Sequence, residues 1–255
     1  MKNKQCDVVT KAAMYCVDMI QNCDIDFSAM KSEDKPYPGS LIVLEGVDGA
    51  GKTTHALRLV DHLNSKGLAS RYVRTPGGTE LGEKIRDIVL YHTGPIDDLT
   101  EMFLFQAQLS ACIRDVIRPA LDSGEVVVCD RLIFSTMAYQ GAGRQMDLDM
   151  LHTMQKVSLQ GVWPDFGFLM YSDKVKESDG SRMEDEAPSF LARVHAMYKM
   201  LPTFNPTVCD MMTTITLQET EEETFNLIKD STYVSLSRIH EARERSMLKQ
   251  KGFEC

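Results

Sequence analysis

Short apolar runs alternate along this chain with longer stretches in which apolar residues recur at helical spacing. Short runs rich in β-branched residues predict strands. They fall near residues 41–45, 70–74, 126–130, 166–171 and 213–217. The intervening stretches predict helices near residues 52–65, 79–91, 98–122, 147–160, 187–200 and 219–230. Regular alternation of strands and helices is typical of an α/β fold with a parallel sheet.

The run Val126–Cys129 is apolar without interruption. A strand that alternates with polar residues has one face in solvent, whereas an uninterrupted apolar strand is buried on both faces. We therefore expect residues 126–130 to form a central strand. The expected architecture is a five-stranded parallel sheet flanked by helices, in three layers.

The two ends of the chain depart from this alternation. Residues 7–21 predict one amphipathic helix, and residues 31–39 are charged and then proline-rich, as in a linker. This helix could dock on the rest of the chain or mediate self-association. We therefore predict an N-terminal extension and linker over residues 1–39, a catalytic domain over 40–230, and a C-terminal helical tail over 231–255, where residues 232–250 predict a further helix.

Composition narrows the functional classes. The formal net charge of −9 argues against a sequence-independent nucleic-acid binder, which needs a basic surface. No apolar run approaches the length of a membrane span. The seven cysteines are odd in number and include no C-x-x-C pair, as expected for free thiols in a reducing compartment. We expect a cytoplasmic protein, or one in the host-cell cytosol if the source is viral.

The strongest chemical signal is the segment 46–53, which reads Gly-Val-Asp-Gly-Ala-Gly-Lys-Thr and follows the apolar run 41–44. This is the G-x-x-x-x-G-K-[ST] phosphate loop between a strand and a helix. The glycines let backbone N–H groups converge on phosphate oxygens. The lysine brings a charge to the phosphates and the threonine can bind Mg²⁺. The expected ATP-binding residues are Gly46, Gly49, Ala50, Gly51, Lys52, Thr53 and Thr54.

Three further segments add candidate residues at strand ends. Arg74 precedes a Gly-Gly turn at the end of the second predicted strand, which suits a second anion site. Asp130 and Arg131 close the buried strand, where a carboxylate can hold Mg²⁺ and an arginine can reach a transferring phosphoryl group. Residues 135–144 combine hydroxyls, an aromatic, an amide and an arginine, a composition suited to a sugar and a base.

Together these motifs resemble the thymidylate kinase family of P-loop nucleoside-monophosphate kinases. The resemblance runs over residues 40–230 and rests on segments 45–54, 74–79, 117–121, 130–131 and 135–144, extended by 164–165 and 182–184. It implies a P-loop kinase fold and the ATP- and Mg²⁺-dependent phosphorylation of a deoxypyrimidine monophosphate, above all dTMP to dTDP. It also implies a homodimer packed through helices, for which the apolar face of helix 98–122 is the candidate surface.

The resemblance also implies roles for individual residues. Asp48 would bind the deoxyribose 3′-hydroxyl, Phe105 would stack on the pyrimidine, and Tyr139 would crowd the sugar 2′ position. Arg74 would bind the acceptor phosphate, Arg131 would lie between the two substrates' phosphates, and Arg182 would pack on the adenine. The implied catalytic residues are Asp48, Lys52, Arg131 and Arg182; the substrate-binding residues are Asp48, Arg74, Phe105, Leu109, Arg131, Ser135, Tyr139 and Gln140; the Mg²⁺ ligands are Thr53 and Asp130.

The chain departs from the family pattern at two places. Family members usually carry an arginine four residues after the stacking aromatic, and here that residue is Leu109. Leucine cannot donate a hydrogen bond to thymine O4, and Gln106, Gln108 or Arg114 could replace the donor. The lid, at about residues 172–186, is short and lacks the usual arginines. Lys174, Lys176, Arg182 or Arg144 could supply the missing cation.

These departures leave alternatives open. The acceptor could be dUMP or a 5-modified dUMP in place of dTMP. In another class, the chain could be a non-catalytic nucleotide-binding module that acts through its N-terminal segment. A switch-type GTPase is set aside because the sequence has no N-K-x-D motif.

Overall fold

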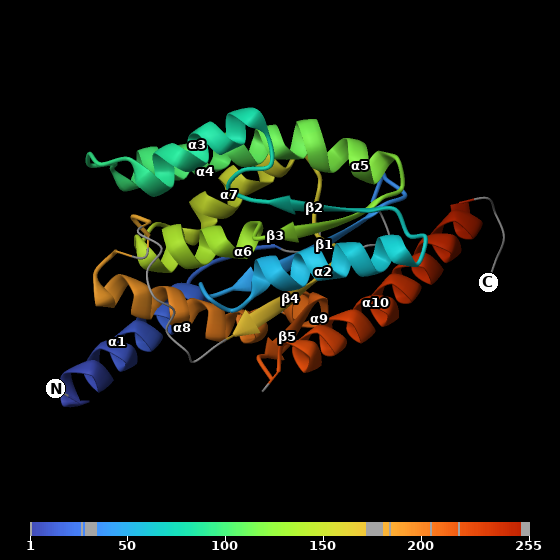
Figure 1. Cartoon of the computed structure of the whole chain (residues 1–255). Coiled ribbons are helices and arrows are strands. Elements are labelled where there is room, and N and C mark those ends of the chain that lie inside the picture. Colours follow the sequence, from blue (N-terminus) through green and yellow to red (C-terminus); the bar gives the residue numbers. More distant parts are fainter. Residues whose placement is uncertain are drawn as a thin grey trace.

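The computed structural model describes residues 2–26, 28, 35–171, 181–183, 185–204, 206–218 and 220–250. Five parallel strands form one sheet in the order β2-β3-β1-β4-β5 (Figure 1). The strands are β1 (Ser40–Gly46), β2 (Ser70–Arg74), β3 (Val126–Asp130), β4 (Phe166–Tyr171) and β5 (Met212–Thr216). The predicted parallel five-stranded sheet is confirmed, with every strand end within one residue of its expected position.

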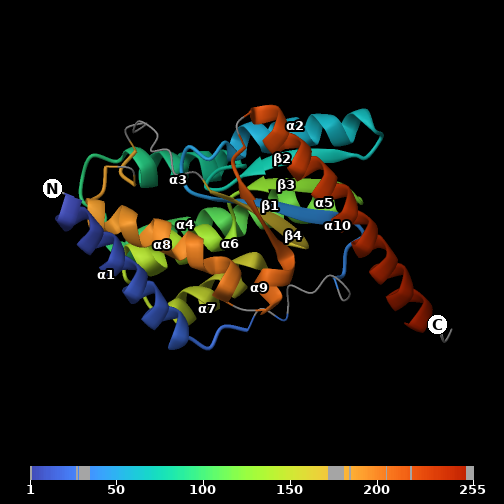
Figure 2. The ribbon, with the colours of Figure 1, turned by 90° about the horizontal axis from the view of Figure 1, so that it is seen from below.

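Helices cover both faces of the sheet. They are α1 (Lys2–Gln21), α2 (Lys52–Ser65), α3 (Glu80–Tyr91), α4 (Asp98–Cys112), α5 (Arg118–Asp122), α6 (Ile133–Thr136), α7 (Leu148–Leu159), α8 (Pro188–Phe204), α9 (Pro206–Met211) and α10 (Glu221–Gln250), with π-helical segments η3 (Ile113–Ile117) and η4 (Met137–Gly143). Because parallel crossovers are right-handed, α2 covers one face and α4, α5, α7 and α8 cover the other. Helix α10, which follows the last strand, lies on the face of α2 and contacts it (Figures 1 and 2). Within the described ranges, no helix is both long and apolar enough to cross a membrane.

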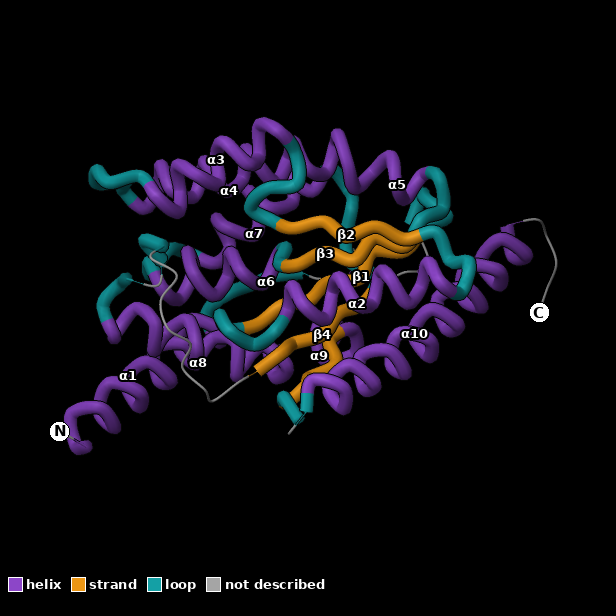
Figure 3. Tube along the Cα trace, in the orientation of Figure 1, coloured by secondary structure: helices purple, strands orange, loops and turns teal. Residues whose placement is uncertain are grey.

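The central strands position the site. Every residue of β1 and β3 is buried, as predicted for β3 from its uninterrupted apolar run. The carboxyl ends of β1, β3 and β4 meet at one edge of the sheet (Figure 3). From β1 the chain runs first toward β2 and later toward β4 and β5, so a crevice opens at this edge, where ligands bind in such sheets.

The helix expected over residues 98–122 consists of α4, the π-helical segment η3 and α5. Pro119 accounts for the change of geometry. Its nitrogen carries no hydrogen, so it cannot donate the regular i→i−4 bond of an α-helix. The helical direction continues, but one turn before the proline widens to π geometry.

The C-terminal region was predicted less well. The two expected helices, 219–230 and 232–250, are one helix, α10, which runs through the boundary predicted between residues 230 and 231. Thr232 is fully buried and its hydroxyl donates to the Ile228 carbonyl, 2.8 Å away. Ser231 and Thr232 disfavour helix in isolation, but burial outweighs that preference. The short helices α6 and α9 were not predicted.

The N-terminal helix docks on the rest of the chain. Ala12 and Cys16 are buried where α1 packs along α8 (Figure 2). Farther along, the buried Lys35 ammonium forms an ion pair with Asp165 over 3.0 Å, and Arg243 of α10 pairs with the same carboxylate over 2.8 Å. One buried charge cluster therefore joins the segment before β1, the turn before β4 and the C-terminal helix.

Candidate active site at the carboxyl edge of the sheet

Three glycines with positive φ shape the phosphate loop between β1 and α2. Gly46, Gly49 and Gly51 have φ values of 133°, 77° and 75°, which glycine adopts without steric cost. A Cβ on Gly46 would lie 1.9 Å from the Met170 carbonyl oxygen, so no larger residue fits. Among the described side chains, none caps the first turn of α2. The N–H groups of this turn are therefore available to bind an anion.

Lys52 is enclosed by the phosphate loop. It is 6% exposed, and its ammonium donates to the Val47 carbonyl, 2.7 Å away. Burial, together with the neighbouring charge of Arg131, lowers the pKa of Lys52 to about 8, against the opposing effect of Asp48. A bound phosphate would supply the anionic partner that favours the charged ammonium.

Thr53 and Asp130 meet beneath the loop. The Thr53 hydroxyl donates to Asp130 Oδ2 over 2.5 Å, and the Tyr72 hydroxyl donates to the same oxygen over 3.4 Å. A hydroxyl and a carboxylate are ligands that suit Mg²⁺, which usually takes one or two protein oxygens and completes its shell with phosphates and water. Within the described ranges, no group of three or more His, Cys, Asp or Glu side chains could hold a metal by itself. The Thr53–Asp130 pair fits a Mg²⁺ that the nucleotide helps to hold.

Asp48, Arg131 and Tyr139 form a charged cluster beside the loop. The Arg131 guanidinium donates to Asp48 Oδ1, and the Tyr139 hydroxyl donates to Oδ2 over 2.5 Å. Burial disfavours the charged carboxylate, but Arg131, Lys52 and the Tyr139 hydroxyl together hold the pKa of Asp48 well below its usual range. Arg131 has a φ of 67°, an unfavourable conformation for a side chain with a Cβ, and such strain clusters at functional sites.

Glu45 supports this cluster and was missed as a site residue in the sequence. It is fully buried, accepts from the N–H groups of Leu132 and Phe134, and accepts the Ser135 hydroxyl over 2.6 Å. The Ser135 hydroxyl also bonds Tyr198, which accepts from Arg131 over 2.9 Å. A carboxylate inside the apolar run of β1 was the available signal, since buried glutamates are rare without partners.

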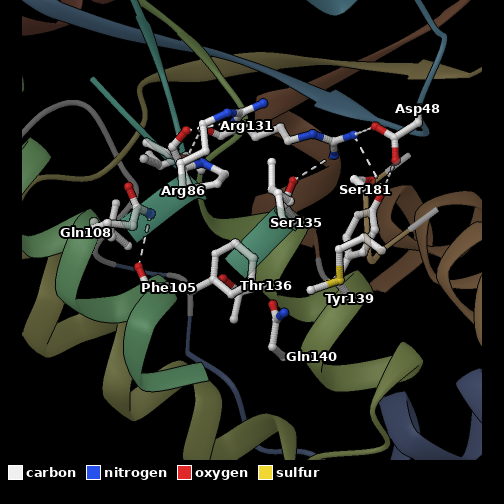
Figure 4. Close-up of a pocket in the computed structure, with 16 residues that line it drawn as sticks. Asp48, Arg86, Phe105, Gln108, Arg131, Ser135, Thr136, Tyr139, Gln140 and Ser181 are labelled. Atoms are coloured by element: carbon white, nitrogen blue, oxygen red, sulfur yellow. Dashed lines mark hydrogen bonds and ion pairs between the residues drawn. The ribbon is translucent and has the colours of Figure 1, made fainter. Parts of the chain in front are cut away.

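A pocket opens beside this cluster, and it brings most of the expected substrate residues together. Figure 4 shows Asp48 and Arg131 at one side and Phe105 and Gln108 at the other. The lining comprises Asp48, Thr75, Pro76, Arg86, Leu90, Phe105, Gln108, Leu109, Arg131, Leu132, Ser135, Thr136, Tyr139, Gln140, Ser181 and Met183. The lining combines charged groups, such as Asp48 and Arg131, with apolar side chains, such as Phe105 and Leu109, which suits a ligand that carries both a phosphate and a flat ring.

Leu109 is in the pocket wall, where the family pattern has an arginine. Of the candidate replacements, Arg114 pairs with Asp115 and is exposed, and Gln106 is buried but is not part of the lining. Gln108 lines the pocket, but its amide already bonds the Gly77 N–H and the Phe105 carbonyl. Arg86, which the sequence reasoning overlooked, lines the pocket and donates to the Pro76 carbonyl over 2.9 Å.

Arg74 ends β2 next to the pocket residue Thr75 but is not itself in the lining. Its guanidinium forms an ion pair with Glu83 over 2.7 Å. Glu83 also accepts from the Gly78 N–H, so the Gly-Gly turn and Arg74 are held together. The Arg74 side chain is about half exposed to solvent.

Arg182 and Arg144, two of the four candidates for the lid cation, share a carboxylate partner. Both contact the fully buried Glu101: Arg144 over 2.9 Å and Arg182 over 3.4 Å. Arg182 also donates to the Val89 carbonyl, and Arg144 pairs with Glu186. This network holds both arginines at the α3–α4 side, and the packing of Arg182 on the adenine stays a prediction. Lys174 and Lys176 fall outside the described residues.

Comparison with known proteins identifies the family of this chain. The family model described as thymidylate kinase matches residues 44–228. A thymidylate kinase of Pelotomaculum thermopropionicum is 38% identical over 177 residues, covering 66% of this chain and 82% of that protein. One from Leifsonia xyli is 41% identical over 172 residues, covering 64% and 82%. The crystal structure of a thymidylate kinase from Ehrlichia chaffeensis superimposes with a TM-score of 0.63 at 29% identity, covering 78% of this chain and all of that one. The chain belongs to the thymidylate kinase family.

Proposed function

We propose that this protein transfers the γ-phosphoryl group of ATP to the 5′-phosphate of dTMP, giving ADP and dTDP. The observation that carries the proposal is the junction of two sites. The phosphate loop and the Asp48–Arg131–Tyr139 cluster adjoin, and all three residues of this cluster line a pocket that also contains Phe105 and Leu109. Two nucleotides bound on either side would present their phosphates to each other, and positioning of this kind is the main source of phosphoryl-transfer catalysis.

On the donor side, we propose that the loop N–H groups and Lys52 bind the ATP phosphates. Thr53 and Asp130 would hold Mg²⁺, which neutralises charge that develops on the phosphates. Arg131 would contact the phosphates between the two substrates. Its hydrogen bonds to Gly46, Asp48, Ser135 and Tyr198 support this role, because they fix the guanidinium before substrate binds.

On the acceptor side, we propose that Phe105 stacks on the base and that Tyr139 and Asp48 contact the sugar. The partly buried Tyr139 ring packs against Phe190 and Tyr198, so it cannot easily move away from a ribose 2′-hydroxyl. Gln140 is the proposed partner of the base edge. Arg74 is the proposed contact to the acceptor phosphate, which would replace part of its pairing with Glu83.

Leu109 occupies the position in the base site where the family usually has an arginine. We propose that Arg86 supplies a hydrogen-bond donor there instead. Arg86 is the one guanidinium besides Arg131 in the lining formed by the described residues. The apolar neighbours Leu90, Leu109 and Met183 favour a base that carries a methyl group over one that does not. This supports dTMP above dUMP as the acceptor.

We further propose that the protein is a homodimer and cytoplasmic. Apolar side chains between 44% and 54% exposed gather on the adjoining helices α3 and α4: Leu81, Ile88, Tyr91, Leu99 and Phe103. A second copy of the same face would cover them. The five cysteines whose side chains are described are free thiols, which supports a reducing compartment.

An ADP-release assay with ATP and Mg²⁺ tests the proposed reaction. The acceptors are dTMP, dUMP, 5-hydroxymethyl-dUMP, dCMP, UMP and dGMP at equal concentration. We expect dTMP to give the highest kcat/KM. A higher value for another acceptor would reject the proposed substrate, and ATP binding without turnover of any acceptor would favour the interaction-module alternative.

A further inference from the structure

The π-helical segment η4 carries two of the residues proposed to contact the acceptor, Tyr139 and Gln140. The last carbonyl groups of a helix have no partner within the helix and must find one elsewhere. The carbonyls of Tyr139 and Gln140 accept from the N–H groups of Arg144 and Met146, over 2.9 and 3.2 Å. The carbonyls that follow lie in a buried stretch and take their donors from another element.

Arg193 of α8 supplies those donors. Its Nε donates to the Ala142 carbonyl over 2.8 Å, and its Nη2 donates to the Gly143 carbonyl over 2.6 Å. Both carbonyls belong to buried residues, where an unpaired carbonyl is unfavourable. A guanidinium at the end of a helix also interacts favourably with the negative end of the helix dipole. Among the described residues, Arg193 is not part of the pocket lining, so it acts on the acceptor only through η4.

Helix α8 also packs directly on η4 around these bonds. A Cβ on Gly143 would lie 2.5 Å from a ring carbon of Phe190, so the end of η4 lies against that ring. The same ring packs on the ring of Tyr139, with their centres 6.4 Å apart. Phe190 thus restrains the Tyr139 side chain, while Arg193 restrains the backbone segment that carries it.

The N-terminal helix α1 supports this part of α8 from outside (Figure 2). The Cys16 thiol is fully buried and donates to the Arg193 carbonyl over 3.5 Å. Ala12, one turn earlier, is 5% exposed, and α1 also contacts η4 itself. The match to the thymidylate kinase model begins at residue 44, so α1 precedes the matched stretch and supports an element that lies within it.

We propose that Arg193 is a positioning residue of the acceptor pocket and that α1 holds it in place. This inference rests on the proposed function and deepens it. By binding the last carbonyls of η4, Arg193 fixes the segment from which Tyr139 and Gln140 project. The buried contact of Ala12 and Cys16 with α8 fixes the helix backbone at Arg193. The N-terminal extension thereby contributes to acceptor selection without contacting the acceptor.

The test measures amide hydrogen exchange over residues 137–143 in the full-length protein without nucleotide. We expect Arg193→Met to raise this exchange by at least about tenfold, because η4 loses the donors that anchor its last carbonyls. Arg193→Lys keeps the charge but has one donor nitrogen where Arg193 uses two, so its exchange should lie between that of Arg193→Met and that of the wild type. Arg71→Met, at an exposed arginine of β2, is the control and should match the wild type.

A second pair of variants tests the contribution of α1. Ala12→Asp places a charge in the buried contact with α8, which separates the two helices locally. Exchange over residues 137–143 should therefore rise by at least about threefold. Met14→Asp changes a residue of α1 that is 68% exposed and should leave the exchange unchanged.

Steady-state kinetics link this anchoring to the proposed reaction. In Arg193→Met we expect the KM for dTMP to rise at least about fivefold, while the KM for ATP changes less than about twofold. The preference for dTMP over its ribonucleotide counterpart should fall as well, because Tyr139 is held less firmly. A role in stability alone would lower the amount of folded enzyme, and hence the apparent kcat, without changing either KM or the preference.

Wild-type exchange over residues 137–143 in a folded Arg193→Met protein would overturn the inference, as would an unchanged KM for dTMP together with an unchanged preference. If Arg193→Met does not fold, wild-type exchange in Arg193→Lys overturns it. Raised exchange in Arg193→Met but not in Ala12→Asp would reject the contribution of α1. If the wild type has no turnover with dTMP, the proposed function fails instead, and the exchange measurements decide by themselves whether Arg193 anchors η4.

Discussion

At the scale of single residues, neighbouring charges and hydrogen bonds fix the charge and position of the groups that matter most. Asp48 is held ionised by Arg131 and Lys52, and it accepts the Tyr139 hydroxyl over 2.5 Å. All of these residues were candidates from the sequence motifs and the family resemblance that the motifs carry, and their roles stay predictions. The partners of the supporting carboxylates Glu45 and Glu101 could not be predicted, because these partners are more than 35 residues away in the sequence and meet the carboxylates only after folding.

Tyr139 gives the clearest test of sugar selectivity. We expect Tyr139→Ala to raise the ratio of kcat/KM for the ribonucleotide over dTMP by about tenfold, since the ring no longer occupies the 2′ space. Tyr139→Phe keeps the ring and loses the bond to Asp48, so it should keep the wild-type ratio. Kinetics with paired ribo- and deoxyribonucleotides measure both variants. An unchanged ratio in Tyr139→Ala would remove this residue from the sugar site.

The pKa of Lys52 predicts an alkaline limb in the pH profile. The free-enzyme pKa is about 8, below the usual value for lysine. Above this pH the ammonium loses its proton, so kcat/KM for ATP should fall by up to about tenfold per pH unit. Lys52→Arg, whose guanidinium stays charged, should lack this limb even if its activity is lower. The same limb in both enzymes would assign it to another group.

At the scale of elements, the regular strands and the long helices were predictable, because the spacing of apolar residues along the sequence defines them. The π-helical segment η4 was not, although it carries Tyr139 and Gln140. A π-helical turn produces no characteristic spacing of apolar residues in the sequence, and this one depends on contacts with α8 and α7. The docking of α1 on α8 could not be predicted either, because an amphipathic pattern shows that one face of a helix is buried but not which element covers that face.

The buried Glu101 ties α4 to η4 and to residue 182. Its carboxylate accepts from Gln140 over 3.0 Å as well as from Arg144 and Arg182. We expect Glu101→Gln to lower the free energy of unfolding by about 3 kcal/mol, because two guanidinium groups lose their buried counter-charge. The KM for dTMP should also rise, since Gln140 loses its charged partner. Urea denaturation and steady-state kinetics measure the two effects.

Glu186→Gln provides the control for this network. Glu186 pairs with the same Arg144 but is partly exposed, so its loss should cost less than about 1 kcal/mol. An equal loss of unfolding free energy in Glu101→Gln and Glu186→Gln would contradict a special role for the buried carboxylate.

At the scale of the whole molecule, the apolar face of α3 and α4 is the proposed dimer surface. We expect Phe103→Glu to shift the protein from dimer to monomer in sedimentation equilibrium, because a charge on each copy would be buried against the other. Leu227→Glu changes an equally exposed leucine on α10 and should leave the dimer intact. A monomeric wild type, or a dimeric Phe103→Glu variant, would reject this surface.

The central claim is that the phosphate loop and the acceptor pocket form one phosphoryl-transfer site. The most direct measurement follows the γ-phosphate of labelled ATP into dTDP in wild type and Lys52→Ala. The account predicts label in dTDP with the wild type and a rate about a thousandfold lower in Lys52→Ala, with both proteins showing the same circular dichroism spectrum. Undiminished transfer in Lys52→Ala, or no labelled dTDP from the wild type, would contradict it.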